Sequence, residues 1–150
     1  MQSLKIENLS VHSIFPKLKF NLSIQLNAGE IIGLTGPSGS GKSVLFKAIA
    51  DLMEHQGTIT LDGLDKNSFS APQWRKKVML VPAESQWWFD SVGEHFPLLD
   101  KKLLDNNMLS QLDLSPSIFS QQVHEISSGE KQRLSILRAI QYQPEVLLLD

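Results

Sequence analysis

The octapeptide GPSGSGKS at residues 36–43 decides the fold. It places three glycines and a lysine between the apolar run IIGLT and the segment VLFKAIADLM. Glycine tolerates positive φ and lets the backbone approach a ligand closely, so such a loop can turn its N–H groups toward an anion. The octapeptide matches the pattern G-x-x-x-x-G-K-[S/T], in which the loop follows a strand and opens a helix. The sequence therefore predicts a phosphate-binding loop.

The pattern gives each position of the loop a role. Backbone N–H groups of residues 38–43 would surround the phosphates at the positive end of a helix. Lys42 would reach the β- and γ-phosphate oxygens, and the Ser43 hydroxyl would bind Mg²⁺. A glycine-rich connector with a solvated lysine is the alternative, but that connector needs no flanking strand and helix. The predicted nucleotide-binding residues of the loop are Gly36, Pro37, Ser38, Gly39, Ser40, Gly41, Lys42 and Ser43.

Apolar patterns around the loop predict an α/β core. Alternating residues predict a half-buried strand within 19–30, and EIIGLT at 30–35, apolar on both faces, predicts a buried strand that feeds the loop. Helical spacing predicts amphipathic helices from about 42 to 53 and from 127 to Pro144. Three further runs predict strands, GTITLDG (57–63), KKVMLVP (76–82) and EVLLLD (145–150), and residues 91–122 read as a small helical insertion broken by Pro97 and Pro116.

Composition excludes several classes of function. The 150 residues are 41% hydrophobic and carry a formal net charge of −2, so no basic field attracts nucleic acid. Cysteine is absent, which excludes disulfides and thiolate chemistry. No apolar run approaches the roughly 20 residues of a membrane helix. The four histidines, His12, His55, His95 and His124, have no metal-ligand spacing.

The run VLLLD ends in Asp150, a candidate second ligand for Mg²⁺. A phosphate-binding loop needs such an acid at the end of a neighbouring buried strand. An aspartate that caps a turn is the alternative. The metal residues predicted are therefore Ser43 and Asp150.

The stretch ISSGEKQR at residues 126–133 opens the helix that leads to this run. Free N–H groups at a helix N-terminus suit an anion, although Ser-Ser-Gly followed by Glu130 is also an ordinary N-cap. The stretch resembles the signature L-S-G-G-Q/E-x-Q-R of ABC-type ATPases, with Ser128 in place of the first glycine. Together with GPSGSGKS and PEVLLLD, in the family's order and at about its spacing, it makes the whole chain resemble the ATP-binding subunit of an ABC transporter.

The resemblance implies a P-loop NTPase (RecA-like) core with N-terminal antiparallel strands and a small helical subdomain. It divides the chain into 1–83, the strands and the phosphate loop, about 84–127, the helical subdomain, and 128–150, the signature helix and last strand. The cofactors implied are ATP and Mg²⁺, with hydrolysis coupled to transport. SSGEKQR and the short stretch before it are also similar to small bacterial metal-export ATPases.

The resemblance also implies partners. The signature residues Ser127, Ser128, Gly129 and Glu130 would contact ATP held by a second subunit, so that ATP closes a dimer. Membrane-spanning permease subunits would dock on it, which implies a place on the cytoplasmic face of the membrane. The segment QWWF offers Trp87, Trp88 and Phe89 for that docking, with packing under the helical insertion as the alternative. No nucleic acid is expected.

Other positions fit the family less closely. Phe15 is the candidate for adenine stacking, with core packing as the alternative. Ala83 stands where the family has a glutamine near Mg²⁺, with Glu84 and Gln86 close by. The departures at Ala83 and Ser128 make a catalytically weak nucleotide-binding scaffold one rival function. A soluble ABC-type ATPase is another, although such proteins typically carry a long coiled-coil insertion or two fused cassettes, and neither is present. A GTPase is disfavoured, because DSVG at residues 90–93 has no companion N-K-x-D.

In the family, the aspartate that corresponds to Asp150 is followed by a catalytic glutamate and later by a histidine that senses the γ-phosphate. We therefore expect the C-terminal part of the domain to be missing and the natural protein to extend beyond Asp150. The chain alone should bind ATP better than it hydrolyses it. Its last strand is apolar on both faces and would be left as an exposed edge, so the isolated chain should be poorly soluble or assemble with other chains.

Overall fold

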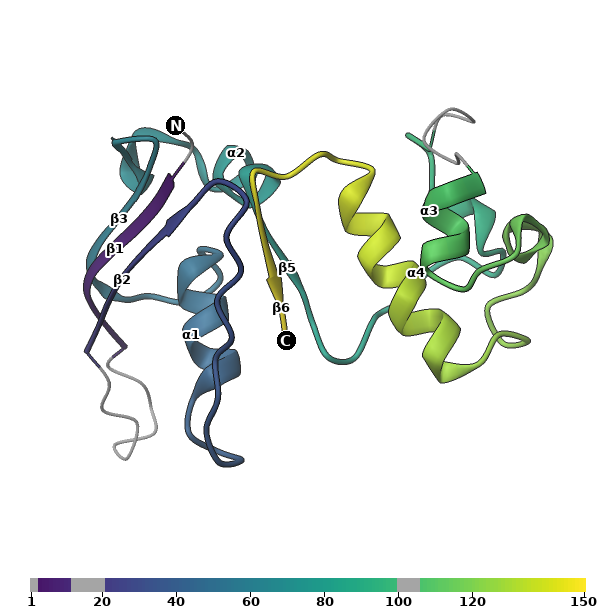
Figure 1. Ribbon diagram of the computed structural model, residues 1–150, viewed down its shortest axis with the longest axis horizontal. Coiled ribbons are helices and arrows are strands. Elements are labelled where there is room, and N and C mark those ends of the chain that lie inside the picture. Colours follow the sequence, from purple (N-terminus) through teal and green to yellow (C-terminus); the bar gives the residue numbers. More distant parts are fainter. Residues whose placement is uncertain (1–2, 12–20, 100–105) are drawn as a thin grey trace. The chain divides into compact units, whose positions relative to one another are not determined.

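The structure is a computed structural model that describes residues 3–11, 21–99 and 106–150 (Figure 1). It contains two compact units of helices and strands. The first comprises the described residues up to Leu80 together with Glu145–Leu148 and Asp150, and the second comprises Val81–Pro144 and Leu149. This mixture confirms the α/β class. The division at residues 83 and 127 stays a prediction.

A four-stranded antiparallel sheet forms one side of the first unit. It consists of β1 (Ser3–Ser10), β2 (Leu22–Asn27), β3 (Gln56–Leu61) and β4 (Leu64–Asp65), in the order β2-β1-β3-β4. Ile6 of β1 lies opposite Ile24 of β2 and Ile59 of β3. The strands predicted within 19–30 and 57–63 are confirmed.

A bulge in β1 explains the spacing of its buried residues. Leu4 and Ile6 obey the period of two, but the next buried residue is Leu9. Asn8 lies between them with φ 52°, and the register shifts there toward both neighbouring strands. Gly57 of β3 approaches this bulge so closely that a Cβ on it would lie 2.5 Å from the Asn8 carbonyl oxygen. The bulge returns Leu9 to the core face.

Two helices and a second sheet, apart from the last residue of each of its strands, complete the first unit. They are α1 (Lys42–Ile49), α2 (Ala71–Lys77), β5 (Val78–Val81) and β6 (Val146–Leu149), and β5 pairs with β6. In Figure 1 these two strands run in the same direction. Trp74 of α2 is fully buried and donates its Nε1–H to the Ile49 carbonyl oxygen at 2.8 Å. The strands predicted at 76–82 and 145–150 are confirmed.

Two predicted boundaries change in the structure. Helix α1 ends at Ile49 rather than near Met53, because the chain turns at Asp51, where φ is 59°. Leu52, which falls within the predicted helix but beyond the observed one, is consequently 52% exposed.

The buried strand predicted at residues 30–35 is wrong. The segment belongs to no strand, and Ile31, Ile32 and Leu34 are 96%, 49% and 38% exposed. An apolar run forms a buried strand only where neighbouring strands complete its hydrogen bonds. Within the described residues β5 and β6 pair with each other, and neither pairs with this segment.

The second unit is built mostly from short helical turns. It contains 3-10 helices at Gly93–His95 and Pro116–Ser120, the short helix α3 (Asn106–Gln111) and the longer helix α4 (Ser128–Ile140). The predicted helical insertion thus holds one short α-helix among its described residues. Helix α4 confirms the predicted signature helix and ends before Pro144. Its buried residues Leu134 and Leu137 pack with Val92, Leu109 and Ile118. No helix among the residues described combines the length and the apolar character that a membrane crossing requires.

Candidate functional site

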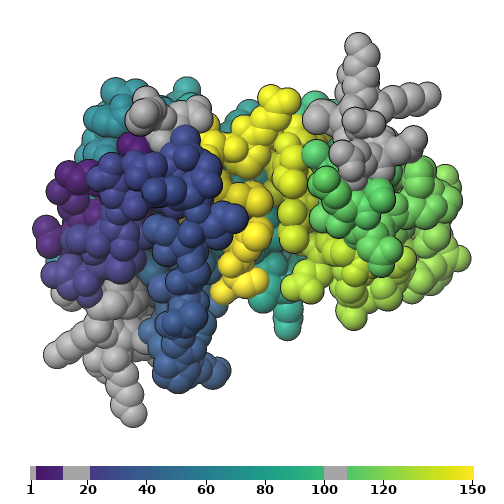
Figure 2. Space-filling view, viewed as in Figure 1, coloured from purple at the N-terminus to yellow at the C-terminus, as the bar shows by residue number. Residues whose placement is uncertain are grey.

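The loop GPSGSGKS adopts the backbone that its glycines allow. Gly39 and Gly41 have φ of +78° and +95°, in the left-handed region, and Gly41 is the N-cap residue of α1. The loop leads into the positive end of this helix, and neither a side-chain cap nor an acidic residue in the first turn offsets that partial charge. The loop lies at the surface, in the blue part of the space-filling view (Figure 2).

The Lys42 side chain folds back over the loop. Its Nζ donates to the carbonyl oxygens of Gly36 at 2.8 Å and Pro37 at 3.0 Å, and it lies 3.5 Å from the Ser40 Oγ. The ammonium group therefore ties the start of the loop to the first residue of α1. It lies beside the backbone predicted to hold phosphate.

Ser43 and Asp150, 107 positions apart, are brought together. The Ser43 hydroxyl donates to Asp150 Oδ1 at 2.9 Å. A hydroxyl and a carboxylate are hard oxygen ligands of the kind that Mg²⁺ takes in phosphate sites. The two residues predicted to bind Mg²⁺ thus fit that ion in chemistry and position, although the binding itself stays a prediction.

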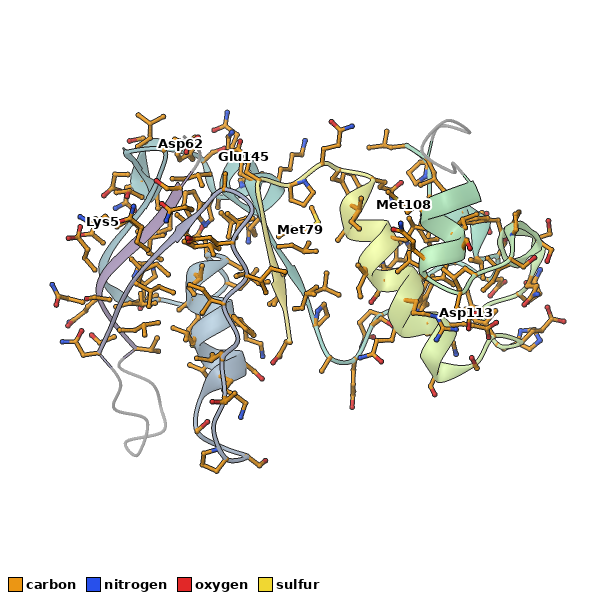
Figure 3. The ribbon with its side chains drawn as sticks, in the orientation of Figure 1. Lys5, Asp62, Met79, Met108, Asp113 and Glu145 are labelled. Atoms are coloured by element: carbon orange, nitrogen blue, oxygen red, sulfur yellow. The ribbon has the colours of Figure 1, made fainter. Side chains whose placement is uncertain are left out.

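Strand β6 positions Asp150. Val146 and Leu148 are buried in the first unit's core, and the strand pairs with β5. At its start, Glu145 forms an ion pair with Lys77 at the end of α2 (Figure 3 labels Glu145). The strand is therefore fixed before it reaches Asp150.

The signature residues form a capping box at the start of α4. The Ser127 Oγ accepts from the Glu130 N–H at 3.2 Å, and Glu130 Oε2 accepts from the Ser127 N–H at 2.8 Å. The Ser127 hydroxyl also donates to Glu130 Oε2 at 2.7 Å, and these bonds hold the pKa of Glu130 below its usual value. The N-cap interpretation of this stretch is therefore confirmed. A contact with ATP of a second subunit stays a prediction for Ser127, Ser128, Gly129 and Glu130.

The aromatic segment at residues 87–89 divides into a packed part and an exposed part. Trp87 is half-buried against the core of the second unit, whereas Trp88 and Phe89 are 64% and 45% exposed. All three rings meet the imidazole of His95 edge-on. The guanidinium carbon of Arg138, from α4, lies 4.7 Å from the centre of the Trp87 ring and 4.8 Å from that of Trp88.

Sequence patterns missed His95 and Arg138. The available signal is weak: His95 lies between the apolar residues Val92 and Phe96, and Arg138 lies one turn from the buried Leu134. Phe15, the candidate for adenine stacking, lies outside the described residues. Ala83 and Glu84 are exposed, and Gln86 offers its carbonyl oxygen to Arg138 at 2.8 Å.

Comparison with known proteins places the chain in a family. A family model described as ABC transporter matches residues 20–150. The chain is 32% identical to the probable iron export ATP-binding protein FetA of Escherichia coli, over 98% of this chain and 69% of FetA. It is 30% identical to the manganese transport system ATP-binding protein MntB of Halalkalibacterium halodurans, over 97% of this chain and 62% of MntB.

A solved structure supports the same fold. The chain is similar to a bacterial Atm1-family ABC exporter with ATP bound, with a TM-score of 0.78, 24% identity and coverage of 99% of this chain and 29% of that one. The chain spans 40% of the rice protein STAR1, to which it is 34% identical. From the family model, the relatives and the three motifs together, the chain belongs to the ABC transporter family.

Proposed function

We propose that this chain forms the Mg·ATP site of a subunit that hydrolyses ATP to power an ABC membrane transporter. The observation that carries the proposal is the hydrogen bond of the Ser43 hydroxyl to Asp150, next to a loop tied by Lys42. A glycine-rich connector has no reason to bring a serine and an aspartate 107 positions apart into contact. The family membership supplies the reaction class.

Each residue of the site takes a role that its position supports. The N–H groups of residues 38–43 would bind phosphate oxygens, and Lys42 would exchange its carbonyl partners for them. Ser43 and Asp150 would hold Mg²⁺, which neutralises charge that develops on the phosphate oxygens.

A second copy or homologue would complete the catalytic unit. The exposed Ser128 and the half-buried Gly129 follow the cap at the start of α4, where N–H groups favour an anion. Ser127 and Glu130 hold that turn through the capping box. The turn is thus pre-ordered for the γ-phosphate of ATP held by the partner.

The membrane partner would dock on Trp88 and Phe89. Aromatic rings are enriched in the buried centres of interfaces, and these two rings are exposed while the adjacent Trp87 anchors the segment in the core. Docking places the protein at the cytoplasmic face of the membrane. The names of FetA and MntB favour a metal ion as the cargo.

Calorimetry and ATP turnover of the full-length protein test the site. Binding of Mg·ATP with steady turnover that falls with Lys42→Ala supports the proposal. Binding without turnover would favour the scaffold, and no binding would refute the site.

Recovery of the protein with membranes that contain its permease tests docking. Trp88→Ala should lower this recovery and leave ATP binding intact. Full recovery of the variant would contradict docking at the segment. Loss of thermal stability without loss of recovery would assign the ring to packing. The cargo is tested by measuring the iron and manganese contents of cells that make the wild type or Lys42→Ala. If neither metal differs between the two kinds of cell, a metal cargo is contradicted.

A further inference from the structure

The hydrogen bonds of His95 define its tautomer. Its Nδ1 lies 3.0 Å from the carbonyl oxygen of Ser91, so this nitrogen carries the proton and donates it. Its Nε2 accepts from the backbone N–H groups of Trp88 and Phe89, both at 3.1 Å. Only the neutral imidazole with its proton on Nδ1 satisfies all three bonds. A second proton on Nε2 would point at two N–H donors.

The imidazole also organises the rings of the aromatic segment. His95 is 2% exposed, and the ring centroids of Trp87, Trp88 and Phe89 lie 4.8, 4.9 and 5.1 Å from its own. The segment belongs to no helix or strand. Its shape therefore depends on this one side chain for two backbone bonds and three ring contacts.

Helix α4 and its C-cap residue Gln141 supply the remaining groups around His95. Gln141 donates its Nε2–H to the His95 carbonyl oxygen at 3.1 Å and accepts from the Leu98 N–H at 3.2 Å. The charged groups that act on the imidazole, among the residues described, are Arg138 from α4 and Glu94 from its own turn. Burial lowers the pKa of His95 and Arg138 lowers it further, while the Ser91 carbonyl and Glu94 act in the opposite direction.

We propose that His95 is the positioning residue of the docking surface formed by Trp88 and Phe89. The neutral imidazole accepts the backbone N–H groups of both residues and so holds their rings exposed, and protonation of the imidazole breaks these bonds and releases the segment. The docking role rests on the proposed function, whereas the local release does not. The subunit would therefore engage its membrane partner at neutral pH and lose this surface on acidification.

The test uses the full-length protein labelled with 5-fluorotryptophan and followed by ¹⁹F NMR from pH 8 to 5. The sequence has three tryptophans, and Trp74, fully buried in the first unit, serves as the internal reference. We expect the Trp87 and Trp88 resonances to shift together below about pH 6.5, the usual pKa of histidine, while that of Trp74 stays constant. The transition should be absent in His95→Gln, whose Oε1 accepts hydrogen bonds but does not titrate.

His124→Gln is the matched control, because His124 is an exposed histidine of the same unit. It should keep the transition. An unchanged transition in His95→Gln, or none in the wild type, would overturn the proposal. Should His95→Gln fail to fold, ¹⁵N spectra of the wild-type histidines decide instead: a proton on Nε2 of His95 at neutral pH would refute it.

Membrane recovery at pH 7.5 and 5.5 separates the two proposals. A tryptophan transition with loss of recovery in the wild type, but not in His95→Gln, supports both. A transition without any loss of recovery would contradict docking at this segment and leave the local role of His95 supported.

Discussion

Replacing Lys42 by alanine should weaken Mg·ATP binding by about tenfold or more. A hydrogen bond to a charged group contributes about 1.5–3 kcal/mol net, which corresponds to about 10- to 150-fold in affinity. The structure favours the lower part of this range. The ammonium group already donates to the Gly36 and Pro37 carbonyl oxygens at 2.8 and 3.0 Å, so a phosphate has to replace these contacts. The net free energy that Lys42 contributes to binding is therefore the difference between its contacts with phosphate and its contacts with the loop carbonyls.

Isothermal titration calorimetry of the full-length protein measures this loss, with Lys47→Ala as the matched control. Lys47 lies in the same helix, carries the same charge and is exposed. It should change the affinity by less than twofold, because salt screens the charge of an exposed side chain that makes no contact with the ligand. Equal affinities of wild type and Lys42→Ala would refute the phosphate-loop assignment. An equal loss in both variants would show that general charge, rather than the Lys42 contact, is responsible.

Three further predictions concern stability. Gly57→Ala should cost about 3 kcal/mol or more of unfolding free energy and Gly63→Ala only about 1, because both have positive φ but only Gly57 would place a Cβ 2.5 Å from a backbone oxygen; urea unfolding with equal losses would contradict this. Ser127→Ala should cost about 1 kcal/mol through loss of the cap, and Ser127→Asn should recover most of it; a thermal melt of Ser127→Ala that matches the wild type would count against it. Urea unfolding at pH 7.5 and 5.5 should show stability falling as the pH drops below about 6.5: burial lowers the pKa of His95 in the folded chain, so the unfolded chain takes up the proton first. Greater stability at pH 5.5 would overturn that sign.

Local sequence patterns correctly predicted the helices and strands whose own residues follow a clear apolar pattern. Helix α1, strand β2 and strand β6 appear where helical spacing, alternation or a short apolar run indicated them. The approach of Ser43 to Asp150 could be expected only from the motif, because no periodicity relates positions 107 residues apart. The phosphate-loop motif carries the expectation that an acid at the end of a neighbouring strand lies close to the loop. Apolar periodicity contains no such information.

The segment at 30–35 shows why the same reasoning fails elsewhere. Its apolar residues favour burial, but a strand forms only when other strands supply its hydrogen bonds. The sequence pattern contains no information about which strands lie next to it. For the same reason the bulge at Asn8 was not foreseen, since it is defined by the register of β1 against two neighbours.

The aromatic segment offered two interpretations from sequence, docking and packing. The structure supports packing for Trp87, and docking stays a prediction. Trp87 packs, whereas Trp88 and Phe89 remain exposed. The His95 contacts that arrange them span six and seven positions and depend on the turn at residues 93–95. Periodicity cannot reveal a side chain that accepts two backbone N–H groups, because such a bond depends on loop geometry rather than on a repeating pattern.

The two side chains proposed to bind the nucleotide's phosphates and Mg²⁺, those of Lys42 and Ser43, both have hydrogen-bond partners within the chain. Lys42 donates to its own loop, and Ser43 donates to Asp150. Binding of Mg·ATP would therefore exchange hydrogen bonds within the chain for bonds to the ligand, and the affinity would reflect the difference between them. A lysine that loses its phosphate would return to the loop carbonyls, so release would leave its N–H donors with hydrogen-bond partners. In the proposed site this exchange would moderate the affinity for nucleotide and ease its release between rounds of turnover.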